Sequence, residues 1–133
     1  SGHAVAVLGL SFKAETDDIR ESPALRIVRT LVEAGVRVRV HDPKALHTFR
    51  DWAERSLGEN AAASITYCNS WQDAATGARV VAILTEWNEY RNLPVQDLSQ
   101  MTASPATIVD ARNLLEPQMV KAAGLGYQGT GRA

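Results

Sequence analysis

Apolar strands alternate with amphipathic helices along the whole chain. Residues 4–10 form an unbroken apolar run, which is typical of a strand buried on both faces of a parallel sheet. Ser22 and Pro23 suit the N-cap and first position of a helix, and Gly35 suits its end. A second apolar strand follows at residues 36–41. This opening unit predicts two parallel strands joined by a right-handed helical crossover.

The alternation continues to the end of the chain. Further strands are predicted at 65–67, 79–84, 107–110 and 125–128, and further helices at 45–57, 70–75 and 117–122, with short helical pieces over 88–100 that Pro94 interrupts. We therefore expect an α/β fold: a Rossmann-like three-layer domain with a mostly parallel sheet and helices on both faces. A chain of 133 residues is the size of one such domain.

Charge and cysteine content narrow the classes of function. A net charge of -1 gives no general attraction to nucleic acid or to an anionic membrane. Cys68 is the single cysteine, so an internal disulfide is excluded and no metal site is expected. No apolar run has the length of a membrane-spanning helix and no signal peptide is visible, which predicts a cytoplasmic domain. Residues 1–3 are either native or the remnant of a tag.

The turn after the first strand is unusual. In open parallel sheets, ligands bind beyond the carboxyl ends of the strands. Gly9 stands at such an end, but the G-x-G-x-x-G spacing that lets a backbone approach a pyrophosphate is missing. Phe12, Lys13 and Arg20 occupy the turn instead. A lysine here can place its ammonium against a phosphate, and the N-terminus of the helix near Ser22 favours an anion in the same region.

Five motifs resemble the C-terminal, UDP-binding domain of the UDP-glucose/GDP-mannose dehydrogenase family. They are GLSFKAETDDIRESPA, HDPKA, LTEWNEYRNL, VDARNLLEP and GLGYQGTGR, and they occur in the family's order. These nucleotide-sugar dehydrogenases oxidise the primary alcohol of a sugar to a carboxylate. The resemblance implies that residues 4–133 are a UDP-sugar-binding domain, and that the family's N-terminal NAD-binding domain and central helical segment are absent from this chain.

The resemblance also implies the activity of the full-length parent. The motifs are nearest to the UDP-glucose branch, which performs an NAD-dependent, two-step oxidation of UDP-glucose to UDP-glucuronate for polysaccharide biosynthesis. The GDP-mannose and UDP-N-acetylmannosamine branches are the alternatives. The family's catalytic cysteine lies outside this chain, because Cys68 matches no part of its motif, so the isolated chain is expected to be inactive. The full-length enzyme is expected to be a homodimer or a larger oligomer.

Two other functions are alternatives for this chain. The chain resembles a dehydrogenase domain, yet a stand-alone nucleotide-binding module without redox activity is compatible with the same motifs. A dinucleotide-binding oxidoreductase domain in its own right is disfavoured, because the glycine fingerprint is missing.

The resemblance assigns the substrate contacts to Phe12, Lys13 and Arg112. The alternative for Lys13 is a solvated loop lysine, and for Phe12 an aromatic that covers the edge of the core. Arg112 follows the fifth strand and is expected to converge with Lys13 on one pocket, although almost a hundred residues separate them.

Arg20 is assigned to the cofactor, because the family's matching arginine reaches toward NAD on the N-terminal domain. The alternative is an ion pair with Asp17, Asp18 or Glu21 that fixes the loop. Asp17 and Asp18 are expected to bond to loop amides, since carboxylates would repel a diphosphate.

Three further residues near the strand ends are expected to be structural. Trp87 follows a buried strand, which favours the core over stacking on a base. Asp110 and Asn113 are expected to shape the turn after the fifth strand.

Overall fold

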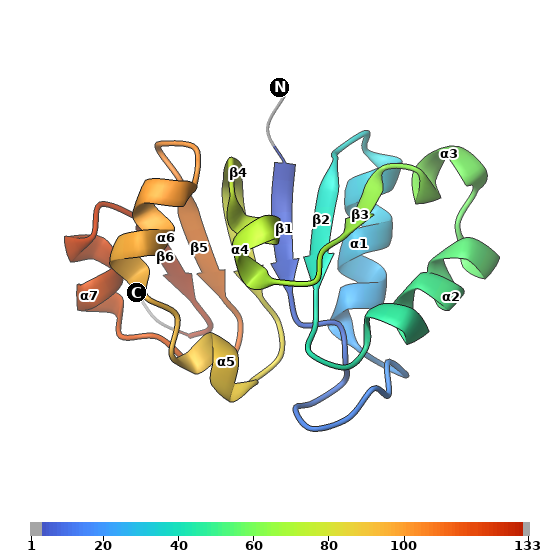
Figure 1. Ribbon diagram of the computed structural model, residues 1–133, viewed down its shortest axis with the longest axis horizontal. Helices are drawn as coiled ribbons and strands as arrows, with labels where there is room; N and C mark the ends of the chain where they lie inside the picture. The colour runs from blue at the N-terminus through green and yellow to red at the C-terminus, as the bar shows by residue number, and fades with distance from the viewer. Residues whose placement is uncertain (1–3, 132–133) are drawn as a thin grey trace.

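The computed structural model describes residues 4–131. Within them lies a six-stranded sheet in the order β3-β2-β1-β4-β5-β6, in which every neighbouring pair is parallel (Figure 1). The strands are β1 (Ala4–Leu8), β2 (Val38–His41), β3 (Ile65–Tyr67), β4 (Ala78–Ile83), β5 (Thr107–Asp110) and β6 (Gly126–Gly129). All six were predicted, and their ends differ from the predicted ones by two residues at most.

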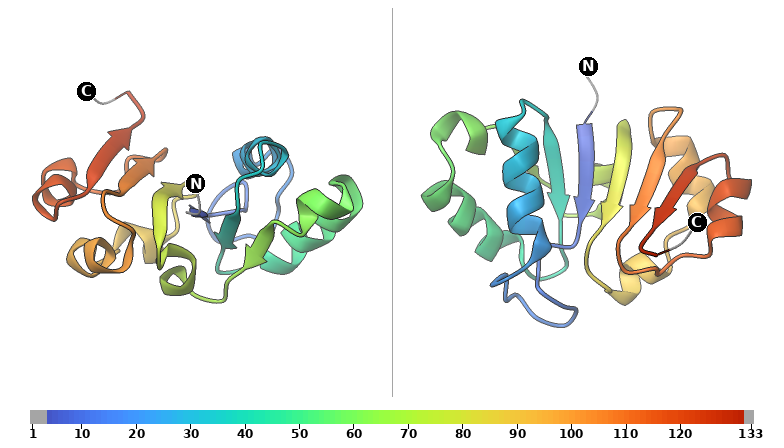
Figure 2. Two further views of the ribbon diagram at one scale, coloured as in Figure 1. Left: turned by 90° about the horizontal axis from the view of Figure 1, so that it is seen from above. Right: turned by 180° about the vertical axis from the view of Figure 1, so that it is seen from behind.

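Helices cover both faces of the sheet (Figure 2). They are α1 (Pro23–Glu33), α2 (Leu46–Ser56), α3 (Glu59–Ala62), α4 (Trp71–Ala75), α5 (Asn88–Arg91), α6 (Val95–Met101) and α7 (Pro117–Ala122). α1 and α2 enclose one hydrophobic core, and α4, α6 and α7 enclose the other. The predicted three-layer α/β architecture is confirmed, whereas the one-turn helix α3 was not predicted.

The two cores follow from the pleat of the central strand. Successive side chains of a strand point to opposite faces. In β1, Ala6 and Leu8 therefore join the core beneath α4 and α6, while Val7 joins the core beneath α1. A strand that must be apolar on both faces gives the continuous apolar run seen in the sequence.

The start of α1 was predicted correctly. The Ser22 side chain accepts a hydrogen bond from the amide of Ala24 at 3.2 Å, and Pro23 occupies the first turn, where a missing N–H costs nothing. Gly35 has φ +84° just after the helix, in the left-handed region that glycine adopts easily. The first turn of α1 is thus anchored directly after the long loop that leaves β1.

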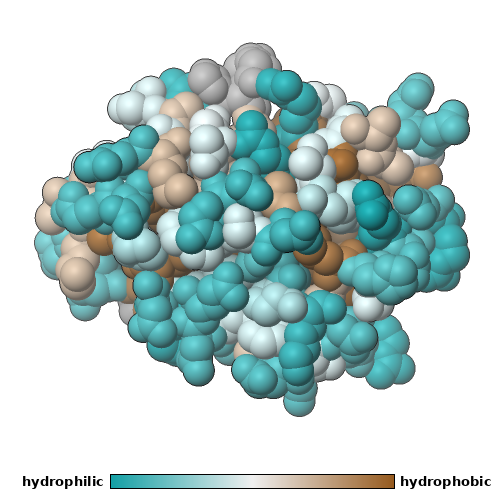
Figure 3. All heavy atoms as spheres, in the orientation of Figure 1, coloured by the Kyte–Doolittle hydropathy of each residue, from teal (hydrophilic) through white to brown (hydrophobic). Residues whose placement is uncertain are grey.

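The strand order locates the edge at which a ligand is expected. β1 lies between β2 and β4, so the direction in which the chain winds reverses at β1 and β4. All strands end at the lower edge in Figure 1, where the β1–α1 loop and α5 also lie. Figure 3 shows that hydrophilic residues dominate this edge. Polar ligands of open parallel sheets bind at such a switch point.

No helix of residues 4–131 is both long and apolar enough to cross a bilayer, and the two longest have 11 residues each.

Candidate functional site

The β1 exit packs tightly against the β4 exit at the switch point. Gly9 has φ +106°, and a Cβ there would lie 2.6 Å from the amide nitrogen and from Oγ1 of Thr85. Thr85 Oγ1 donates a hydrogen bond of 2.9 Å to the carbonyl oxygen of Ser11. Glycine is needed here because another loop of the protein approaches the backbone. In a dinucleotide site, a pyrophosphate would take that space.

Asp42 directly follows β2 and is buried. The residue is 2% exposed. Oδ1 accepts the amides of Lys44 and Ala45, both at 2.8 Å, and Oδ2 accepts the amides of Leu10 and Ser11 at 2.8 and 3.0 Å. In dinucleotide-binding domains an acidic residue at the corresponding place binds a ribose hydroxyl. Here both carboxylate oxygens accept hydrogen bonds from donors of the protein itself.

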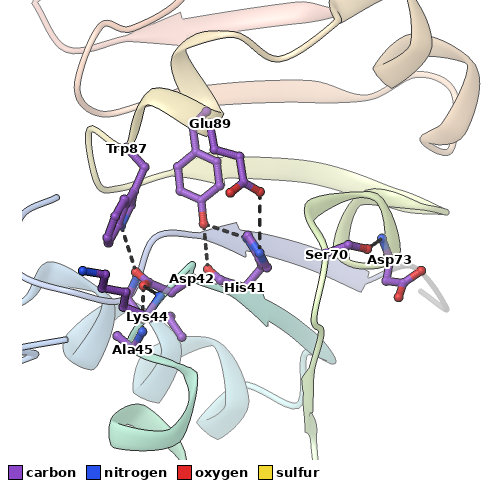
Figure 4. Close-up of polar contacts among 10 residues, drawn as sticks. His41, Asp42, Lys44, Ala45, Ser70, Asp73, Trp87 and Glu89 are labelled. Atoms are coloured by element: carbon purple, nitrogen blue, oxygen red, sulfur yellow. Dashed lines mark hydrogen bonds and ion pairs between the residues drawn. The ribbon is translucent and has the colours of Figure 1, made fainter. Parts of the chain in front are cut away.

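Trp87, which follows β4, packs against Asp42 and Ser11. The indole Nε1 lies 3.3 Å from both Asp42 Oδ2 and Ser11 Oγ, and the side chain points toward Asp42 in Figure 4. The residue is 5% exposed and belongs to the core beneath α4. The structural interpretation of Trp87 is confirmed, and its ring is not open to stack on a base.

Phe12 and Lys13 come directly after Ser11 in the chain, and both are exposed. Phe12 is 48% exposed, which is exceptional for a large apolar residue in this protein. Lys13 is exposed too, and among residues 4–131 no carboxylate forms an ion pair with it. Phe12 is not among the buried residues of either hydrophobic core. Both side chains are thus available to a ligand at the switch point.

The loop that carries them has a defined shape. The amide of Phe12 donates to the carbonyl of Asp18 at 2.7 Å, which closes the loop on itself. Glu15 and Glu21 have φ of 68° and 61°, a region that residues other than glycine rarely adopt. These features restrain the backbone of the loop that carries Phe12 and Lys13.

Arg20 is engaged by a carboxylate of the same loop. Its Nε and Nη2 donate to the two carboxylate oxygens of Asp18 at 3.0 and 2.8 Å. This bond holds the pKa of Asp18 at about 2. The ion pair foreseen as the alternative for Arg20 is therefore present, and Asp18 also accepts the amide of Arg20 as expected. The Arg20 side chain is 87% exposed, and its contact with a cofactor stays a prediction.

Arg112 lies after β5 and faces Glu86 after β4. Arg112 Nη2 is 3.4 Å from Glu86 Oε1, and that oxygen is buried without a hydrogen-bond partner among the described residues. Because β4 separates β1 from β5, the exits of β1 and β5 lie about 10 Å apart. Lys13 and Arg112 therefore belong to the same edge of the sheet, and their convergence on one pocket stays a prediction.

The turn after β5 is shaped as predicted. Asp110 is buried and accepts the amides of Leu114 and Leu115 at 3.0 and 2.8 Å. Asn113 has φ 54°, and its side-chain amide exchanges two hydrogen bonds with the backbone of Thr130. These contacts fix the backbone on both sides of Arg112.

Cys68 has none of the features of a nucleophile. It is buried, its Sγ lies 3.9 Å from the carbonyl oxygen of Thr66, and burial raises the pKa of the thiol. An activated cysteine needs the opposite shift. Within residues 4–131 there is also no group of three or more histidine, cysteine and acidic residues placed to hold a metal ion.

Asp42 and Ser11 are the residues that sequence reasoning missed. The available signal was an aspartate that follows an apolar strand and precedes a proline, within the HDPKA motif. Its side-chain partners Ser11 and Trp87 lie after other strands, so the spacing along the chain does not indicate them.

Comparison with known proteins shows which family the chain resembles. Residues 6–117 match the family model described as "UDP-glucose/GDP-mannose dehydrogenase family, UDP binding domain". The chain belongs to this family. The UDP-glucose 6-dehydrogenase of Pseudomonas aeruginosa is 39% identical over 131 residues, which are 98% of this chain and 28% of that protein.

Two solved structures agree with this assignment. A UDP-glucose dehydrogenase from Pyrobaculum islandicum superposes with a TM-score of 0.72 at 34% identity, over 99% of this chain and 26% of that one. A UDP-D-ManNAc dehydrogenase from Pyrococcus horikoshii gives 0.71 at 26% identity, over 98% of this chain and 26% of that one. The chain thus spans little more than a quarter of the relatives it matches.

Proposed function

We propose that this chain is the UDP-sugar-binding C-terminal domain of an NAD-dependent UDP-glucose 6-dehydrogenase. The enzyme would oxidise UDP-glucose to UDP-glucuronate in two steps, and the missing part of the protein would supply the catalytic cysteine. The observation that carries the proposal is the exposed pair Phe12 and Lys13 on a fixed loop at the switch point. An aromatic ring and a free ammonium are complementary to a base or sugar face and a diphosphate.

The residues of this chain do not fit a dinucleotide cradle. Thr85 fills the space beside Gly9, and the Asp42 carboxylate has no free oxygen for a ribose. We therefore assign NAD to the part of the enzyme that this chain lacks. Arg20 would contact it from across the domain cleft, after exchanging Asp18 for the cofactor.

The role of the domain would be to hold the nucleotide while the sugar reacts elsewhere. Binding energy from a remote part of a substrate can position the reacting group. Lys13 would bind the diphosphate and Arg112 the same ligand from the β5 exit. A homodimeric or larger assembly and a cytoplasmic location remain predictions for the whole enzyme.

The experiment that tests the proposal is a comparison of substrates with the full-length enzyme. The highest kcat/KM is expected with UDP-glucose. A preference for GDP-mannose or UDP-N-acetylmannosamine would move the chain to a sister branch of the family. The isolated chain should fold and produce no NADH from NAD and UDP-glucose. Turnover by the isolated chain that survives Cys68→Ser would contradict the division of labour proposed here.

A further inference from the structure

Three strand exits meet in one buried polar cluster. Ser11 after β1, Asp42 after β2 and Trp87 after β4 are each less than a tenth exposed, and we call them the Asp42 cluster. Asp42 Oδ2 lies 3.1 Å from Ser11 Oγ and 3.3 Å from Trp87 Nε1. Segments separated by 31 and 45 residues in the chain are thereby joined by side-chain hydrogen bonds.

The cluster bonds to the backbone of Lys13. Ser11 Oγ lies 2.9 Å from the carbonyl oxygen of Lys13, as well as 3.3 Å from Trp87 Nε1. The serine hydroxyl can accept from the indole and donate its one hydrogen to Lys13 or to Asp42. The Asp42 cluster thus contacts the backbone of Lys13 on its buried side, while the residue itself is exposed to solvent.

Stability alone does not explain a polar cluster in this place. A buried polar network is often no more stabilising than apolar residues of similar volume, but it restricts geometry, because buried donors and acceptors must be satisfied in specific directions. Here Asp42 accepts the amides of Leu10 and Ser11, and the Ser11 hydroxyl lies within hydrogen-bond distance of the carbonyl of Lys13. These backbone groups lie on either side of Phe12.

We infer that the Asp42 cluster is the positioning device of the nucleotide site. Ser11, Asp42 and Trp87 hold the segment with Phe12 and Lys13 in the conformation that binds the UDP-sugar, without touching the ligand themselves. This inference rests on the proposed function of Lys13. It adds that affinity for the nucleotide depends on three buried side chains behind the site.

The same edge of the sheet provides a matched control. Tyr90 is buried, and its hydroxyl oxygen lies 3.0 Å from the carbonyl oxygen of His41 and 2.8 Å from His41 Nδ1. Tyr90→Phe removes a buried polar group, as Ser11→Ala does, but among residues 4–131 the Tyr90 side chain forms no hydrogen bond with Phe12 or Lys13. A purely structural role for Ser11 would make the two variants behave alike.

The test uses Ser11→Ala, Trp87→Phe and Tyr90→Phe in the full-length enzyme, each with and without Lys13→Ala. Binding of UDP is measured by calorimetry, together with Tm and the KM values for UDP-glucose and NAD. Ser11→Ala and Trp87→Phe should each weaken UDP binding about three- to ten-fold, the size of a neutral hydrogen bond. The KM for UDP-glucose should rise while that for NAD stays unchanged. Tyr90→Phe should lower Tm and leave UDP binding as it was.

Combining each variant with Lys13→Ala shows whether Ser11 affects UDP binding through Lys13 or independently of it. Because Ser11 acts through Lys13, Ser11→Ala should cost much less affinity in the Lys13→Ala background than in the parent. Full additivity, or normal UDP binding by Ser11→Ala and Trp87→Phe, would overturn the inference even though Lys13→Ala alone weakens binding. Normal binding by Lys13→Ala would instead refute the proposed role of Lys13. Trp87→Phe keeps the test decisive where Ser11→Ala does not fold.

Discussion

The Nδ1 atom of His41 lies 2.8 Å from the phenol oxygen of Tyr90, in a buried pair at the end of β2. The single hydrogen of the Tyr90 hydroxyl can go to Nδ1 or to the carbonyl oxygen of His41, which is 3.0 Å away. Nε2 lies 3.7 Å from a carboxylate oxygen of Glu89. Burial disfavours the charged imidazole, whereas the carboxylate beside Nε2 favours it.

This pair predicts a loss of stability in mild acid. Burial lowers the pKa of His41 from its ordinary value of 6.5, although Glu89 and Asp42 act in the opposite direction. Between the lowered pKa and 6.5 the unfolded chain binds more protons than the folded one, so the free energy of unfolding falls as the pH drops through this window. The measurement is Tm against pH for the parent and for His41→Asn, whose amide can still donate to Tyr90.

His41→Asn should flatten the decline below pH 6.5, whereas His47→Asn should keep it, since the His47 side chain is 86% exposed. Identical profiles for the parent and His41→Asn would show that His41 is not the group responsible.

A second prediction concerns the contact between Gly9 and Thr85. Gly9→Ala combines a strained positive φ with a Cβ 2.6 Å from backbone and side-chain atoms of Thr85, and should lower the free energy of unfolding by about 2–4 kcal/mol. Gly35→Ala is the control, because φ is +84° but nothing lies within 4 Å of the added Cβ. It should cost about 1 kcal/mol. Denaturant unfolding of both variants measures the difference, and equal losses would show that the Thr85 contact yields to the new side chain.

The elements of the fold were predictable because they depend on local pattern. β1 and β4 are apolar on both faces, and Ser22 with Pro23 marks the start of α1 whatever the rest of the chain does. The helix α3 was missed because its four residues are too few to show a period, and none of them is buried.

The site was predictable only where it is local too. Lys13 and Phe12 stand out in the motif, and the pair of Asp18 with Arg20 spans two residues of one loop. The Asp42 cluster depends on which strands are neighbours. Strand order arises from how the crossovers pack, and hydrophobic period carries no information about it.

A third prediction separates the cofactor from the substrate. Arg20→Ala in the full-length enzyme should raise the KM for NAD and leave the KM for UDP-glucose nearly unchanged, because the exposed guanidinium is proposed to contact NAD across the domain cleft. Arg26→Ala, an exposed arginine on α1, is the matched control and should change neither value. Steady-state kinetics with each substrate varied in turn provide the test. A rise confined to UDP-glucose would reassign Arg20 to the sugar nucleotide.

The central claim is that the β1–α1 loop binds the phosphates of a UDP-sugar through Lys13, with Arg112 as a second contact. The most direct measurement is calorimetric binding of UDP-glucose to the full-length enzyme and to its Lys13→Ala, Arg112→Ala and Lys121→Ala variants, with a melting curve for each. Losing a charge-assisted hydrogen bond costs about 1.5–3 kcal/mol, or roughly ten- to a hundred-fold in affinity. Lys13→Ala and Arg112→Ala should show this loss at an almost unchanged Tm, and Lys121→Ala, an exposed lysine in the last turn of α7, should show none. Parent-like affinity in Lys13→Ala, or a large fall in its Tm, would contradict the assignment of this loop as the phosphate site.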